Sequence, residues 1–256
     1  MDDRKSPWEE LEKRSKIYEK CFKLLGLDKG VEYVRGSNIQ ETKDYQNEVL
    51  KASALVTVTR ATRAASEICR MEDPKVSSLI YPIMQSLDCW ALDVDMAYGG
   101  TDQRHAYILS RELLPELNHN APIVISTPLG KSLTGKEKMS ASKKQSRLEL
   151  FAEPEEIRKK INEAFCPAKT LEENPILEYN KYFIFPRIQE LKVEREQRFG
   201  GDVTFKDYQS LEKSFLTGDL HPLDLKKTTT EYLIKILKPV REYFYNNPRL
   251  LETYKE

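Results

Sequence analysis

The spacing of apolar residues changes once along this chain, and this change constrains the fold more than any single residue does. In the first part, three short and mostly apolar runs, which are strand candidates, alternate with segments of helical periodicity. The runs cover residues 31–34, 94–98 and 123–125. Such alternation predicts a parallel sheet covered by helices. Further on, only helical patterns occur, at residues 154–165, 176–185 and 228–244. We therefore predict an α/β domain over residues 1–152 and an all-α domain over residues 153–256.

The helices of the first part have recognisable ends. Ser6, followed by a proline and a glutamate, predicts a helix start, and Gly26 is placed to end that helix. Residues 44–71 have helical character, and an Asp-Pro pair predicts a further helix over residues 73–92. Another helix is expected between the second and third apolar runs, ending near Leu114.

Composition excludes several classes of protein. The 256 residues contain no apolar run near the roughly 20 residues that span a bilayer, and the charged start has no apolar segment behind it. The four cysteines lie far apart, with no CxxC pair, so a disulfide framework and structural zinc are not expected. We expect a cytoplasmic protein. The 41 basic and 41 acidic residues give a net charge of zero, so the net charge does not reveal whether the surface has a basic patch for nucleic acid.

Three polar side chains share one face of the helix expected at residues 73–92. Tyr81, Gln85 and Asp88 are spaced by four and three residues, which places them in one row of an α-helix. Apolar neighbours on both sides indicate that this row faces a cavity. There a carboxylate accepts a hydrogen bond from a hydroxyl group, and an amide and a phenol can hold an ammonium group. The spacing alone is also that of a solvated stripe on an amphipathic helix.

Two glycines and an acid follow the second apolar run. Gly99 and Gly100 permit the close approach of a ligand, and Asp102 is placed to hold ribose hydroxyls. In parallel sheets, nucleotides bind outside the carboxyl ends of the strands, which is where this segment is expected. A plain strand-to-helix turn with Asp102 as its N-cap explains the same residues.

A lysine-rich segment, 136–144, follows the third apolar run. Lysines on a loop with Gly and Ser can close over a triphosphate and follow its charge to the leaving group. A solvated charged loop is the simpler alternative. A P-loop is a second alternative, because Gly130, Gly135 and Lys136 have its spacing. That motif requires Ser or Thr where Glu137 stands, so the P-loop is excluded.

Taken together, the motifs resemble one enzyme family. KMSAS at 138–142 resembles the KMSKS signature of class I aminoacyl-tRNA synthetases. YPIMQSLD at 81–88 and GGTDQR at 99–104 are similar to the tyrosine-binding helix and the ribose turn of tyrosyl-tRNA synthetases. FGG at 199–201 and HPLDLK at 221–226 are similar to the anticodon-binding domain in the archaeal and eukaryotic branch. Five motifs in order and at family spacing identify the chain as a member of this family.

The resemblance implies a role for each motif in the reaction. Asp88 would accept the hydroxyl of a tyrosine substrate. The α-amino group of tyrosine would be held by Tyr81, Gln85 and Gln103. ATP would be bound by Gly100, Asp102, Lys138, Met139 and Ser140. The catalytic cations would be Lys136 and Lys138.

The resemblance also implies the partners. Arg63 and Arg104 would face the acceptor end of tRNA(Tyr), while Phe199 would stack on the first anticodon base and Asp224 would hydrogen-bond it. Mg²⁺ would accompany ATP, bound chiefly through the phosphates, and no protein metal site is implied. Residues 1–152 would be part of a Rossmann-type catalytic domain with connective helices and the lysine loop, and residues 153–256 the anticodon-binding domain. A homodimer through about residues 40–90 is expected.

The sequence departs from the family pattern in two places. In this family a HIGH motif binds ATP opposite the lysine loop. The chain has three histidines, His105, His119 and His221, and none of them belongs to such a motif. In family terms the chain begins just after the second strand, so an N-terminal lobe is expected to complete it, in the same polypeptide or in a separate one. Ala141 stands where lysine or serine is usual.

Two functions remain open on the sequence. One is a tyrosine–tRNA ligase present as a truncated or split chain that is inactive alone. The other is a non-catalytic, tRNA-binding paralogue. The presence of Tyr81, Gln85, Asp88 and the lysine loop favours the ligase, because a protein that only binds tRNA does not need them.

Overall fold

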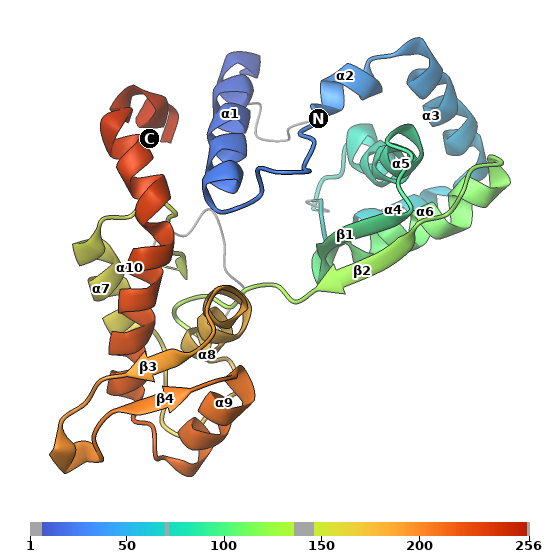
Figure 1. Ribbon diagram of the computed structural model, residues 1–256. Coiled ribbons are helices and arrows are strands. Elements are labelled where there is room, and N and C mark those ends of the chain that lie inside the picture. The colour runs from blue at the N-terminus through green and yellow to red at the C-terminus, as the bar shows by residue number, and fades with distance from the viewer. Residues whose placement is uncertain (1–6, 70–71, 136–145, 255–256) are drawn as a thin grey trace. The chain divides into compact units, whose positions relative to one another are not determined.

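The computed structural model describes residues 7–69, 72–135 and 146–254 (Figure 1). The chain forms two compact units. Residues 32–129 make up the first, called the sheet unit below, and residues 6–31 together with 130–256 make up the second, the helical unit. This division differs from the predicted boundary near residue 152, because the first helix and the segment after residue 129 pack with the helical unit.

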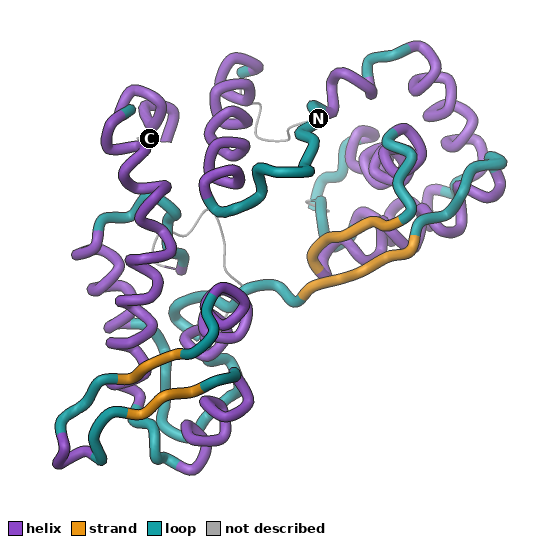
Figure 2. The backbone as a smooth tube through the Cα atoms, viewed as in Figure 1, coloured by secondary structure: helices purple, strands orange, loops and turns teal. Residues whose placement is uncertain are grey.

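The sheet unit is built around one pair of parallel strands. Its elements are α2 (Gly36–Gln40), α3 (Lys43–Leu55), α4 (Val58–Ala65), α5 (Val76–Ala91), β1 (Met96–Gly100), the 3₁₀ turn η1 (Thr101–Gln103), α6 (Arg104–Glu116) and β2 (Ile123–Thr127). Met96 lies opposite Ile123 and Gly100 opposite Thr127, so both strands end at the same edge. The expected parallel sheet and covering helices are therefore confirmed (Figure 2).

Two details of the predicted sheet unit are wrong. The strand expected at residues 31–34 has no regular structure, and both of its valines are 42% exposed. A strand needs a hydrogen-bonded neighbour, and neither β1 nor β2 pairs with this segment. The single helix expected at residues 44–71 is two helices. Val56 is extended at the end of α3, and the Thr57 side chain caps α4 by accepting a hydrogen bond from the Arg60 amide at 3.2 Å.

The core of the sheet unit lies between its helices. Side chains from α3, α5 and α6 fill it, including Tyr45, Val49, Leu87, Leu109 and Leu114. Ala97 on β1 reaches the same core. The packing fixes which face of α5 is buried and which is left for polar side chains.

The helical unit contains more than helices. Its elements are α1 (Trp8–Leu24), α7 (Pro154–Glu163), α8 (Pro175–Tyr179), the π-helical turn η3 (Asn180–Ile184), η4 (Phe185–Arg187), β3 (Leu191–Val193), η5 (Gln197–Phe199), β4 (Val203–Phe205), α9 (Tyr208–Thr217), α10 (Pro222–Asn246) and η6 (Pro248–Tyr254). The predicted helical region is confirmed. An antiparallel pair, with Leu191 opposite Phe205, was not expected from the sequence. Three residues per strand are too few to show alternation in the sequence.

The first helix ends as predicted. Gly26 has φ +105°, and the amide of Leu27 donates to the carbonyl oxygen of Phe22 at 2.9 Å, which closes the last turn. Ser6, the predicted N-cap, lies outside the described residues.

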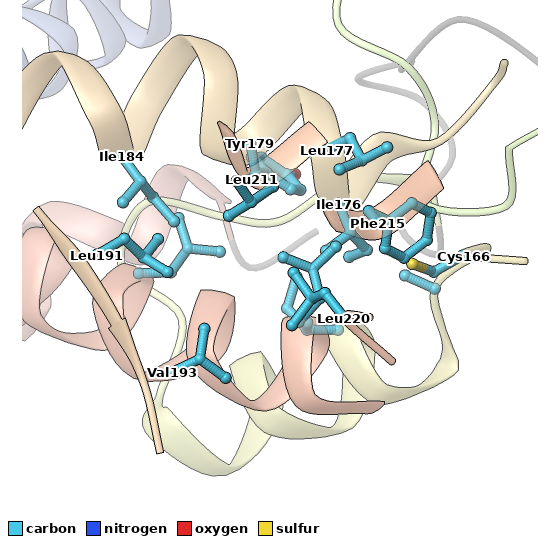
Figure 3. Packing of buried hydrophobic residues seen from close by; sticks show 14 of the residues in the cluster. Cys166, Ile176, Leu177, Tyr179, Ile184, Leu191, Val193, Leu211, Phe215 and Leu220 are labelled. Carbon is cyan, nitrogen blue, oxygen red and sulfur yellow. The ribbon is translucent and has the colours of Figure 1, made fainter. Parts of the chain in front are cut away.

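Side chains from α8, β3 and α9 gather in the main core of the helical unit (Figure 3). Within this core, the amide of Asn180 donates to Thr229 Oγ1 at 2.7 Å, and both residues are fully buried. None of the described helices has the length and apolar character required to cross a membrane.

Candidate functional site

The helix α5 carries the first predicted constellation. Its apolar side chains, such as Ile83 and Leu87, are buried in the core of the sheet unit. Gln85 and Asp88 are partly buried, and Tyr81 is 40% exposed. These three side chains are therefore not a fully solvated stripe, the alternative that their spacing left open.

The carboxylate of Asp88 is held by two residues from other helices. Gln40, the last residue of α2, donates from Nε2 to Oδ1 at 3.0 Å and to Oδ2 at 3.2 Å. The hydroxyl of Tyr45 on α3 lies 2.7 Å from Oδ1 and also 2.7 Å from the carbonyl oxygen of Met84. Asp88 is thus part of a network that fixes its orientation.

Gln85 and Gln103 are brought together. Gln103 is the last residue of η1, which follows β1 directly, and its Oε1 accepts a hydrogen bond from Nε2 of Gln85 at 3.1 Å. Among the described residues, the buried Oε1 of Gln85 has no hydrogen-bond partner. Since a buried acceptor without a partner is costly, this oxygen is suited to a donor from a bound molecule.

The phenol of Tyr81 remains protonated well above neutral pH. Burial raises its pKa above the ordinary value, and electrostatic repulsion by Cys69, Asp88 and Tyr107 in their ionised forms adds to the effect. Its hydroxyl can therefore both donate and accept hydrogen bonds.

The glycine turn lies at the carboxyl end of β1. A Cβ atom on Gly100 would be 2.6 Å from Oδ1 of Asp102 and 2.9 Å from Leu129, so a side chain does not fit without movement of both. Thr127 at the end of β2 donates to the carbonyl oxygen of Gly99 at 3.2 Å. Asp102 is the second residue of η1 and caps neither η1 nor α6, whose N-cap residues are Gly100 and Gln103. The alternative role of Asp102 as an N-cap is therefore wrong.

The predicted lysine loop falls outside the described residues. This applies to Lys136, Lys138, Met139 and Ser140. The residues that flank the loop are described and belong to the helical unit. The amide of Leu133 donates to the carbonyl oxygen of Ser146 at 3.0 Å. The amide of Lys131 donates to Oε2 of Glu178 at 2.8 Å, and burial is the main cause of the raised pKa of this carboxyl group.

The candidate tRNA-binding residues lie in both units. Arg63 is in the last turn of α4, and Arg104 is the first residue of α6. Phe199 is 58% exposed, and the guanidinium of Arg198 lies 4.8 Å from its ring centroid. Asp224 is in the first turn of α10. Among the described residues, no hydrogen bond or ring contact joins Phe199 to Asp224.

Sequence reasoning missed Gln40 and Tyr45. They are 48 and 43 residues from Asp88 along the chain, and they lie in a polar stretch without a recognisable motif. No local signal reveals them, because only the packing of α2 and α3 against α5 brings them to the carboxylate.

Comparisons with known proteins identify the family. The family model described as tRNA synthetases class I (W and Y) matches residues 1–238. The tyrosine–tRNA ligase of Haloarcula marismortui is 42% identical over 267 residues, covering 100% of this chain and 77% of that protein. The tyrosine–tRNA ligase of Methanopyrus kandleri is 43% identical over 240 residues, covering 93% of this chain and 74% of that protein.

Solved structures give the same result. The crystal structure of tyrosyl-tRNA synthetase complexed with L-tyrosine from Archaeoglobus fulgidus matches with a TM-score of 0.90 and 43% identity. The match covers 93% of this chain and 75% of that one. The resemblance seen in the motifs is confirmed. The chain belongs to the tyrosyl-tRNA synthetases, within the class I aminoacyl-tRNA synthetases.

Proposed function

We propose that this chain takes part in the ATP-dependent activation of tyrosine and its transfer to tRNA(Tyr). The observation that carries the proposal is the arrangement on α5. Asp88 is oriented by two partners, and Gln85 lies against Gln103 with a buried acceptor still available. A carboxylate beside an amide pair suits a ligand with a hydroxyl group at one end and an ammonium group at the other.

In this proposal each group of the site has one task. Asp88 accepts the phenol hydroxyl of tyrosine, and the α-amino group is held by Tyr81, Gln85 and Gln103. A carboxylate oxygen of tyrosine attacks the α-phosphorus of ATP, and the bond to pyrophosphate breaks. A ribose hydroxyl of the tRNA then attacks the carbonyl carbon of the adenylate, and AMP leaves. The protein contributes chiefly positioning and charge stabilisation.

ATP is proposed to bind at the carboxyl end of β1. Gly100 contacts the ribose through its backbone, and Asp102 accepts hydrogen bonds from the ribose hydroxyls. A Cβ atom on Gly100 would collide with the Asp102 carboxylate, so glycine lets Asp102 lie against this turn, which supports assigning the two residues to one site. The phosphates are bound by Lys136, Lys138, Met139 and Ser140. Mg²⁺ accompanies ATP and is bound chiefly through these phosphates.

The tRNA is proposed to bind both units. Arg63 and Arg104 serve its acceptor end. Phe199 stacks on the first anticodon base, and Asp224 hydrogen-bonds that base. The large exposed fraction of the Phe199 ring supports a stacking role.

We also propose that the site needs further structure. Parallel sheets are normally covered on both faces. Met96 and Tyr98 on β1 share one face with Ile123 and Ile125 on β2, and all four are exposed. This apolar face, with the absence of a HIGH sequence from the 256 residues, supports an N-terminal lobe, in the same or a separate polypeptide, that packs there and completes the ATP site.

A homodimer through residues 40–90 is the proposed assembly. Leu50, Val58 and Val76 in that segment are exposed apolar residues, which supports it. The second candidate, a tRNA-binding paralogue without catalysis, is less favoured, because the ordered network around Asp88 has no use in a protein that binds only tRNA.

The proposal is tested by equilibrium binding. Isothermal titration of the 256-residue chain with L-tyrosine and with L-phenylalanine should give a clear preference for tyrosine. Asp88→Ala should remove most of that preference, because the residue that reads the hydroxyl is gone. Equal affinities of the unaltered chain for both amino acids would contradict the assignment of the site.

A further inference from the structure

Tyr45 is buried and its hydroxyl points into the carboxylate network of Asp88. The residue is 2% exposed and lies in the first turn of α3, where its amide is bound by Oγ1 of Thr42 at 3.3 Å. Its ring stacks on Trp90 with centroids 6.5 Å apart. The position of the hydroxyl is thus set by the packing of α3.

The proton of the Tyr45 hydroxyl has two acceptors within reach, the Asp88 carboxylate and the Met84 carbonyl, each at 2.7 Å. Hydrogen bonds to an ionised acceptor are about twice as strong as those between neutral groups, so the carboxylate is favoured. If the Tyr45 hydroxyl donated to the Met84 carbonyl instead, its oxygen and Oδ1 of Asp88 would face each other at 2.7 Å without a proton between them, which is repulsive. Burial, and then Asp88, raise the pKa of the phenol far above neutrality, so the proton is always available to donate.

The two oxygens of Asp88 are used unequally. Oδ1 receives the Tyr45 hydroxyl at 2.7 Å and Gln40 at 3.0 Å. Among the hydrogen bonds of the described residues, Oδ2 receives only the longer contact from Gln40, at 3.2 Å. A carboxylate has about four acceptor positions, so Oδ2 keeps capacity for a further donor.

We propose that Tyr45 is a positioning residue of the tyrosine site, which saturates Oδ1 of Asp88 and leaves Oδ2 to accept the substrate phenol. The inference rests on the proposed function, because it assumes that Asp88 reads the hydroxyl of tyrosine. Tyr45 acts through Asp88 and does not touch the substrate. It therefore contributes to the choice between tyrosine and phenylalanine from the interior of the protein.

The test uses Tyr45→Phe in the 256-residue chain, which removes one oxygen and keeps the ring on Trp90. One hydrogen bond to a charged group corresponds to roughly 10- to 100-fold in binding. If Asp88 loses its orientation, the substrate phenol loses its own hydrogen bond to that carboxylate, so titration should show tyrosine affinity reduced by about that factor, with phenylalanine affinity unchanged. The matched control is Ser86→Ala, which removes a buried hydroxyl from α5, the helix that carries Asp88. That hydroxyl donates to the carbonyl oxygen of Pro82 at 2.9 Å. This control should leave the ratio of the two affinities unchanged.

A double-mutant cycle separates positioning from general damage. In the Asp88→Ala background, Tyr45→Phe should no longer change the ratio of tyrosine to phenylalanine affinity, because its partner is gone. Urea denaturation of the same four chains should show coupling between the two sites in the free energy of unfolding.

The outcomes distinguish the inference from the proposed function. If the unaltered chain prefers tyrosine and Tyr45→Phe keeps that preference, the inference is overturned and the function stands. If Tyr45→Phe lowers both affinities equally, its role is structural and the inference also fails. If the unaltered chain has no preference for tyrosine, the proposed function fails first.

Discussion

Replacing Gly135 by alanine tests the structure at the base of the lysine loop. Gly135 has φ +74°, a conformation that costs an alanine about 1–2 kcal/mol. A Cβ atom there would lie 2.3 Å, 2.4 Å and 2.7 Å from the Cδ1, Cγ and Cβ atoms of Phe165. Because the Cβ atom of Phe165 is among them, rotation of its ring cannot remove the overlap. Overpacking of this kind costs about 1–3 kcal/mol, so the total loss should be about 2–5 kcal/mol.

The matched control is Gly30→Ala in the same unit. Gly30 has φ +73°, and nothing lies within 4 Å of the Cβ atom it would acquire. The backbone penalty is therefore the same and the overlap is absent, so Gly30→Ala should cost only about 1–2 kcal/mol. Urea denaturation, followed by circular dichroism with an unchanged m-value, gives both losses in the free energy of unfolding.

Two results would contradict this reasoning. One is that Gly135→Ala and Gly30→Ala lower the free energy of unfolding by amounts that differ by less than about 0.5 kcal/mol. Such a small difference is expected if there is no overlap with Phe165. The other is strict additivity of Gly135→Ala with Phe165→Ala. The second change removes the ring carbons that the new Cβ atom would meet, so part of the first loss should be recovered.

Three further predictions concern the RNA, the reaction and the core. Phe199→Ala should weaken tRNA(Tyr) binding by roughly 5–150-fold in filter binding, as expected for one lost base stack, and leave tyrosine affinity unchanged. Equal weakening with a tRNA altered at its first anticodon base would refute the contact between Phe199 and that base. The 256 residues alone should be inactive in tyrosine-dependent exchange of pyrophosphate into ATP, since proper placement is worth about 7–11 kcal/mol. An added N-terminal lobe should restore the activity. Strong exchange without that lobe would mean that the ATP site is misassigned. Thr229→Val should lower the free energy of unfolding by about 1–3 kcal/mol, because the buried amide of Asn180 loses one acceptor; an unchanged urea midpoint would refute this.

Much of the fold follows from local patterns. Periodicity was enough to predict α5, α10 and the parallel pair β1 and β2, because helical and strand spacings repeat over a few residues. Gly26 marked the end of α1 for the same local reason. The strands β3 and β4 have three residues each, which is too short for a pattern that would predict them. The run at 31–34 has the composition of a strand but no hydrogen-bonded neighbour among the described strands, and spacing along the chain does not show whether a neighbour exists.

The same contrast holds for the site. The row of Tyr81, Gln85 and Asp88 is a property of one helix and could be read from the sequence, as could the glycine turn and the family. The partners of Asp88 could not, since Gln40 and Tyr45 join it across more than 40 residues of chain. Sequence alone determined which side chains share a helix face. Tertiary packing of α2 and α3 on α5 decided which oxygen of Asp88 remains available, because hydrogen bonds between distant segments depend on how the core brings them together.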